Sequence, residues 1–198
     1  MNSLNFLRVA LFAVVGVGLA ACPPVTSKTP VGTTVKAVRD SGIAGAWRGK
    51  VAEGDVASTF TFLPQEDGTF SVVLVTPPSA KDNGGFGVFG VQTVALGRYR
   101  FINAHETYED NKPAKGTMAD NTIPILYKLS GDTLVLYIVD DAAARDAIKA
   151  GKLKGVVQSG EFGDVTITAA PGDLDTYMAS PAGRALFTKP LVVLKRVK

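Results

Sequence analysis

The stretch ASTFTFLPQEDGTFSVVLVT, residues 57–76, decides the fold class of this chain. Apolar and polar residues alternate on both sides of a short polar segment, with Phe60 and Phe62 before it and Phe70 after it. A period of two is typical of strands that bury one face. The segment QEDG, residues 65–68, places turn-forming residues where a β-hairpin needs them. The stretch therefore predicts two adjacent antiparallel strands.

The same alternation recurs along most of the chain. Ile123, Ile125, Tyr127 and Leu129 repeat it, and Ser130-Gly131-Asp132 then supplies another turn. Ten strands are predicted, over residues 45–52, 57–63, 69–76, 88–96, 98–103, 122–129, 133–139, 155–159, 164–169 and 190–197. That many short strands need a barrel or a sandwich. We predict a mainly β fold, an antiparallel β-barrel-like domain of about ten strands.

Two short helices are expected in the C-terminal half. Asp140 and Asp141 precede the alanine-rich residues 142–150, and Gly151 follows them, which matches capping preferences at both helix ends. The second helix begins at Asp173, where apolar residues recur at helical spacing. We expect both helices to cover an end or a flank of the sheet.

Length and composition limit the classes of protein to which the chain can belong. It has 198 residues, of which 46% are hydrophobic and 20% are charged, so it can form the core of one ordinary domain. Its formal net charge of +3 is far below the clustered positive charge of nucleic-acid-binding proteins. A nucleic-acid partner is therefore not expected.

The first 22 residues indicate a targeting signal. Arg8 precedes the apolar run Val9–Leu19, which has the length of a signal-peptide core and is too short to span a bilayer core of roughly 30 Å. Leu19-Ala20-Ala21-Cys22 follows, and it resembles the bacterial lipobox. An ordinary secretory signal beside a chance cysteine is the alternative. Cys22 is the chain's only cysteine, so no disulfide can involve it within the chain.

The lipobox resemblance implies a lipoprotein of the bacterial cell envelope. Leu19, Ala20 and Ala21 would be recognised by the signal peptidase, and Cys22 would carry fatty acyl chains, such as palmitate, that hold the protein to a membrane. Pro23 replaces the aspartate of the familiar inner-membrane retention signal, so the periplasmic side of the outer membrane is preferred over the inner membrane. We expect a signal peptide over 1–21, a lipid-anchored flexible linker over 22–42 and the barrel-like domain over 43–198.

Gly45-Ala46-Trp47, at the start of the first predicted strand, resembles the Gly-x-Trp element of the lipocalins (calycins). The resemblance implies a lipocalin-like up-and-down barrel with a small apolar cavity, in which Arg196 packs on the Trp47 ring and closes the barrel. The Thr-Asp-Tyr motif of lipocalins is missing, and Trp47 packed only in a core is the alternative. Residues 123–197 are also similar to small uncharacterised bacterial lipoproteins, which implies no activity.

Candidate catalytic groups are few. His105 is the only histidine, and with Glu106 and Glu109 it offers a base or metal ligands, which makes a hydrolase using His105 an alternative. The HExxH and Gly-x-Ser-x-Gly motifs are missing, and such closely spaced acids usually mark a solvated loop. We therefore expect no catalytic residues, no metal and no cofactor.

A glycine-rich stretch, residues 82–90, carries Phe86 and Phe89 and is a candidate lid over a cavity, with a mobile hairpin connection as the alternative. Together these patterns favour a non-enzymatic envelope lipoprotein. Its partners would be a membrane, through the lipid on Cys22, and an apolar small molecule or an envelope component. A structural or protein-interaction lipoprotein is the alternative.

Overall fold

The computed structural model describes residues 24–51, 56–80, 83–109, 112–159 and 163–198. The predicted signal peptide, the peptidase-recognition residues Leu19, Ala20 and Ala21, and Cys22 lie outside the described residues. Within the described ranges, no helix is both long enough and apolar enough to cross a membrane.

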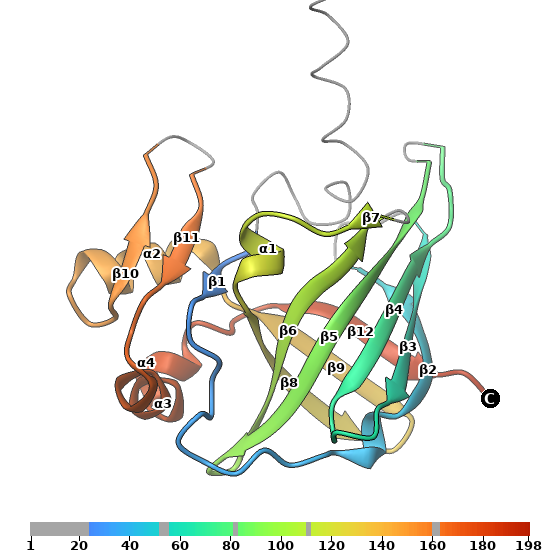
Figure 1. Ribbon diagram of the computed structural model, residues 1–198, viewed down its shortest axis with the longest axis horizontal. Helices are drawn as coiled ribbons and strands as arrows, with labels where there is room; N and C mark the ends of the chain where they lie inside the picture. Colours follow the sequence, from blue (N-terminus) through green and yellow to red (C-terminus); the bar gives the residue numbers. More distant parts are fainter. Residues whose placement is uncertain (1–23, 52–55, 81–82, 110–111, 160–162) are drawn as a thin grey trace, which may run out of the picture.

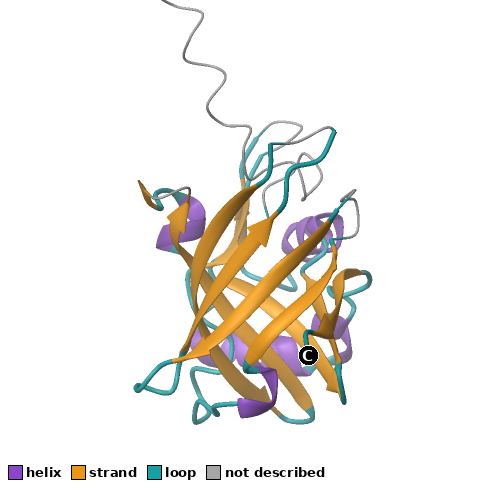
Figure 2. Ribbon diagram, turned by 90° about the vertical axis from the view of Figure 1, so that its right-hand side faces the viewer, coloured by secondary structure: helices purple, strands orange, loops and turns teal. Residues whose placement is uncertain are grey.

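The body of the molecule is a closed antiparallel barrel, as the alternation predicts (Figures 1 and 2). It has eight strands, because the strands predicted over 155–159 and 164–169 belong to a second sheet. The strands follow the order β5-β4-β3-β2-β12-β9-β8-β6, and β6 pairs back with β5 to close the barrel. Strand β7 (Lys112–Pro113) adds a short ninth strand beside β6. The eight strands are β2 (Gly45–Lys50), β3 (Ala57–Pro64), β4 (Phe70–Thr76), β5 (Gly85–Leu96), β6 (Tyr99–Glu109), β8 (Ile123–Ser130), β9 (Thr133–Ile138) and β12 (Pro190–Arg196).

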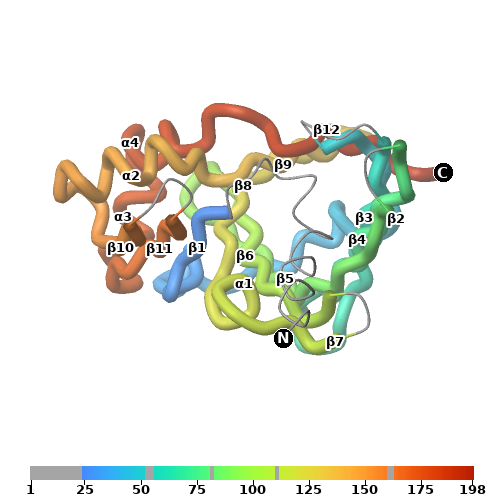
Figure 3. The backbone as a smooth tube through the Cα atoms, turned by 90° about the horizontal axis from the view of Figure 1, so that it is seen from above, coloured from blue at the N-terminus to red at the C-terminus, as the bar shows by residue number. Residues whose placement is uncertain are grey.

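A smaller layer covers one side of the barrel (Figure 3). It holds a second sheet of β1 (Thr26–Ser27), β11 (Val165–Ile167) and β10 (Gly155–Val157). Its helices are α2 (Asp141–Lys149), α3 (Pro171–Ala179) and α4 (Pro181–Arg184), while α1 (Thr117–Asp120) lies beside β6 and a 3-10 helix, η1, spans Ser41–Ile43. The Asp140 side chain caps α2 by accepting from the Ala143 amide, as its position in the sequence indicates.

Two hydrophobic cores lie on the two faces of the barrel wall. The inner core fills the barrel and includes Trp47, Phe70 and Ile102, all almost completely buried. The outer core joins the barrel to the helical layer and includes Phe101 and Met178. Because neighbouring residues of a strand point to opposite faces, Phe101 and Ile102 of β6 serve different cores. Both faces of β6 are therefore buried over this part of the strand.

The prediction of a flexible linker over residues 22–42 is wrong for the described part of that range, residues 24–42. Val25 and Val31 are buried, and β1 pairs with β11 in parallel. Asn103 accepts a hydrogen bond from the Val31 amide and donates one to the Val31 carbonyl, each 2.8 Å long. Side chains of distant elements satisfy the backbone groups of this segment, so it is held in place without a periodic apolar pattern. A segment without such a pattern resembles a linker in its sequence.

Asp175 of α3 makes the most extensive of these contacts. Its carboxylate accepts from the amides of Gly32 at 2.6 Å and Thr34 at 3.0 Å, and from the Thr34 hydroxyl at 2.5 Å. The residue is only 4% exposed. Hydrogen bonds to a buried carboxylate are stronger than those between neutral groups, so Asp175 holds the N-terminal segment to the helical layer.

Asp175→Ala should therefore lower the free energy of unfolding by about 2–3 kcal/mol, because it leaves the buried Gly32 amide without its acceptor. Urea denaturation followed by the fluorescence of Trp47, the only tryptophan, measures this change. Asp173→Ala is the matched control on the same helix, since the Asp173 side chain is 67% exposed. Equal stability of the two variants would contradict the assignment.

Candidate functional site

Arg196 and Trp47 are paired at one end of the barrel, in the arrangement expected from the sequence. The two residues are cross-strand partners in β12 and β2, and the guanidinium carbon lies 4.1 Å from the centroid of the Trp47 ring. The Arg196 guanidinium also donates to the carbonyls of Ala44 at 2.7 Å and Gly42 at 2.6 Å. Cation–π contact and two charged hydrogen bonds thus hold the chain that crosses this end.

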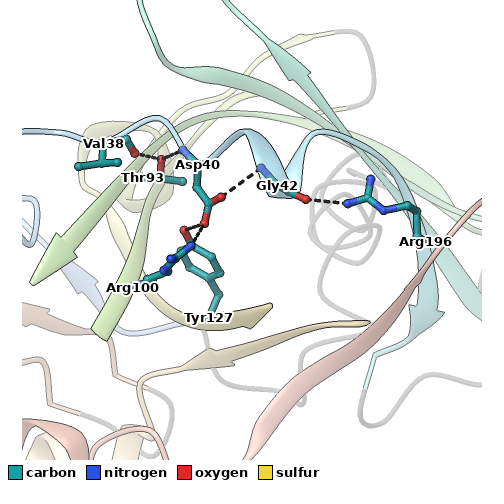
Figure 4. Close-up of polar contacts among 7 residues, drawn as sticks. All are labelled: Val38, Asp40, Gly42, Thr93, Arg100, Tyr127 and Arg196. Carbon is teal, nitrogen blue, oxygen red and sulfur yellow. Dashed lines mark hydrogen bonds and ion pairs between the residues drawn. The ribbon is translucent and has the colours of Figure 1, made fainter. Parts of the chain in front are cut away.

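Residues 38–44, here called the strap, cross this closed end of the barrel ahead of β2 (Figures 1 and 4). The Asp40 carboxylate accepts from the Gly42 amide at 3.1 Å, from the Tyr127 hydroxyl at 2.8 Å and from Arg100. Burial acts to raise the pKa of Asp40, but the hydrogen bonds from Tyr127 and Arg100 outweigh it and lower that pKa. Asp40 is therefore ionised at neutral pH and fixes the position of Arg100.

A hollow of about 360 Å³ lies beside this network at the closed end. A second hollow, of about 270 Å³, shares Arg98 and Tyr99 with the first and extends towards Pro181 of α4. The first hollow is lined by Arg98, Tyr99, Arg100, Leu126, Tyr127, Lys128, Leu129 and Arg184. We call its four cationic residues and Tyr99 the basic groove.

The charge of the basic groove is largely uncompensated. Arg100 forms an ion pair with Asp40. Among the residues that the structure describes, no carboxylate lies within ion-pair distance of Arg98, Lys128 or Arg184. Three positive charges around one hollow favour binding of an anion, because each charge lowers the energy of an anionic group placed between them.

Tyr99 holds two of the three arginines of the groove in place. The Arg184 guanidinium carbon lies 3.5 Å from the centroid of the Tyr99 ring, and the Arg98 Nε donates to the Tyr99 hydroxyl at 2.8 Å. The Nε of Arg184 is buried and has no hydrogen-bond partner in the described part of the chain. Stacking occupies the face of a guanidinium and leaves its in-plane donors for carboxylate or phosphate oxygens. The groove is therefore suited to an oxyanion.

His105 and Glu106 do not form one site. Both lie in β6, which extends to Glu109, whereas a solvated loop was expected there. His105 is exposed and lies over Gly90, its cross-strand partner, while Glu106 is 4% exposed and pairs with Phe89. Their side chains therefore leave opposite faces of the barrel wall. A hydrolase that used His105 with Glu106 would need both groups on one face.

Glu106 lies on the inner face near the other end of the barrel, which we call the mouth. Its Oε1 has no hydrogen-bond partner among the described residues. Burial, together with the nearby Glu109 carboxylate, raises the pKa of Glu106 to about 7. A charged Glu106 is therefore unfavourable in the folded state, and the residue is partly protonated at neutral pH.

The candidate lid with Phe86 and Phe89 is a β-strand. Residues 85–90 belong to β5 and pair in register with β4, so neither a lid nor a mobile connection is present there. Glycines occur here for space, since a Cβ at Gly90 would come within 2.4 Å of the His105 ring. Phe89 packs against the inner core, whereas Phe86 pairs with Val75 of β4.

The basic groove could not be recognised from the sequence, because its residues are far apart in the chain and come from separate elements. Arg98 lies in the β5–β6 turn and Arg100 in β6, Lys128 lies in β8, and Arg184 ends α4. None of the described residues form a group of three or more His, Cys, Asp or Glu that could hold a metal. Comparisons with protein-family models, curated proteins and solved structures gave no match, so the site rests on its own geometry.

The raised pKa of Glu106 predicts a pH dependence of stability. Between the ordinary glutamate pKa of 4.5 and about 7, the folded state binds more protons than the unfolded state. The free energy of unfolding should therefore fall as the pH rises through this window and level off above it.

Glu106→Gln should remove this slope and be more stable than the parent above pH 7, by about 2 kcal/mol after allowance for screening at the mouth. Urea denaturation at pH 5, 6, 7 and 8 measures both effects. Glu66→Gln, in the exposed β3–β4 turn, should keep the parental slope. A parental slope in Glu106→Gln would show that another group causes the dependence.

Proposed function

We propose that this protein is a bacterial envelope lipoprotein that is anchored through Cys22 and binds an anionic envelope component in the basic groove. The observation that carries the binding half is the set of four cationic residues around a hollow of about 360 Å³, where one carboxylate, Asp40, pairs with Arg100. The β-barrel fold is compatible with ligand binding. In this proposal the barrel is a binding module rather than an enzyme.

A ligand outside the barrel is favoured over an apolar molecule within it. The inner core is filled by large side chains such as Trp47, Phe62 and Phe70, which a ligand in the barrel would have to displace. The basic groove requires no such displacement, and its donors are already oriented by Tyr99 and Asp40. Preorganised donors bind oxyanions with a smaller loss of conformational freedom.

The anchoring half is supported by the lipobox-like sequence that ends at Cys22. Growth of the bacterial host with an alkyne-bearing palmitate should label the full chain, and Cys22→Ala should abolish the label. Pro23→Asp keeps the cysteine and introduces the retention residue, so it should remain labelled but move from the outer to the inner membrane fraction. An unlabelled parent chain would contradict anchoring, and an unmoved Pro23→Asp variant would contradict the sorting.

The binding half predicts that inorganic phosphate and a sulfated oligosaccharide bind the full-length protein, with affinity that falls as salt rises. Arg98→Glu and Lys128→Glu should each weaken binding at least tenfold by isothermal titration calorimetry. Arg184→Lys should weaken it as well, because lysine keeps the charge but loses the planar donor edge.

Lys152→Glu is the control, since this exposed lysine makes the same charge change outside the groove. Equal weakening by Lys152→Glu would mean that overall charge, not the groove, attracts the anion. Failure of both probes to bind the parent protein at low salt would contradict the binding half.

A further inference from the structure

An apolar patch lies on the outer face of the barrel near its mouth. Val73 and Val88 are cross-strand partners in β4 and β5, and Val88 is also paired with Tyr108 of β6. Val75 is 43% exposed and Tyr108 is 48% exposed, although both belong to regular strands. We call Val73, Val75, Val88 and Tyr108 the mouth patch. Polar residues usually occupy the outer face of such strands, so this exposed apolar group indicates a surface that contacts another molecule or a membrane.

The N-terminal segment joins the barrel at the start of β8, on the side of the mouth. Thr122 directly precedes β8, whose Ile123 pairs with Ala104, two residues from Glu106 at the mouth. Ser27 and Thr122 exchange two backbone hydrogen bonds, of 2.7 and 2.9 Å, so β1 is fixed beside α1 and the start of β8 (Figure 1). Val25 is 2% exposed, which fixes the chain three residues after Cys22. Three residues reach at most about 10 Å.

We propose that the mouth patch lies against the membrane in which the lipid of Cys22 is inserted. This inference rests on the anchoring proposed above. A lipid held within about 10 Å of Val25 brings the mouth to the bilayer surface, because no long linker separates the two. Lys112 of β7 and Lys115, which lies between β7 and α1, are both exposed, and their charges favour anionic headgroups.

This orientation also determines where the groove faces. Along β6, the seven steps from Glu106 at the mouth to Tyr99 of the groove cover about 23 Å, so the basic groove lies at the opposite end of the barrel from the mouth. The groove then faces away from the anchoring leaflet. Its anion comes from the aqueous side, as a soluble molecule or a glycan, and not from a headgroup of the same leaflet.

Site-directed spin labelling tests the orientation with the full-length, lipidated protein in liposomes of phosphatidylethanolamine and phosphatidylglycerol. Acylation uses the only native cysteine, so a single introduced cysteine takes the nitroxide label. Labels at Val75→Cys and Tyr108→Cys report the mouth patch. Val197→Cys is the matched control, because Val197 is 48% exposed and follows β12 at the closed end.

Collision with oxygen, which concentrates in lipid, is compared with collision with a water-soluble nickel chelate. The oxygen-to-nickel ratio should be at least threefold higher at positions 75 and 108 than at position 197. Equal ratios in protein that carries the lipid and sediments with the liposomes would overturn the docking and leave the anchoring intact.

Two other outcomes would also overturn the inference. Protein that carries no lipid and does not sediment with liposomes would refute the anchoring itself, and the docking with it. Spin–spin broadening at positions 75 and 108 that disappears on dilution with unlabelled protein would assign the mouth patch to a second copy of the chain.

Discussion

The guanidinium of Arg196 is the contact on which the closed end of the barrel depends. It lies over the Trp47 ring and donates to the carbonyls of Gly42 and Ala44, so one side chain joins β12, β2 and the strap. The strap in turn carries Asp40, whose carboxylate orients Arg100 and Tyr127 (Figure 4). The residues around the hollow are therefore positioned in part by a cation–π contact between a half-buried arginine and a buried tryptophan.

Strand β6 couples the barrel to the helical layer. Its alternate residues enter different cores, so Ile102 packs inside the barrel while Phe101 packs against Phe187 outside it. Arg184 ends α4 only three residues before Phe187, and that packing carries its guanidinium onto Tyr99 at the start of β6. The basic groove thus exists only where the two layers meet, and neither layer alone contains its full set of donors.

Local sequence patterns reveal the strands of the barrel, but not the shortest strands or the contacts between distant segments. Alternation identifies strands such as β3 and β4 because a half-buried strand must repeat every two residues, and Asp140 marks a helix start because capping is local. The strands β1 and β7 are two residues long, too short for any period. Asp175 fixes Gly32 across 143 residues of sequence, and the basic groove joins β6, β8 and α4, so both depend on tertiary packing.

The side chains that fill the barrel are separate from those that line the basic groove. Large inner side chains such as Trp47 and Phe70 hold the barrel together, and a ligand inside it would compete with the contacts that stabilise the fold. Arg98 and Lys128 lie outside that core, so their charges can attract an anion without loss of packing. The mouth and the groove lie at opposite ends of the same rigid wall. In the proposed orientation, contact of the mouth with a membrane would leave the groove exposed, because the length of the barrel separates the two.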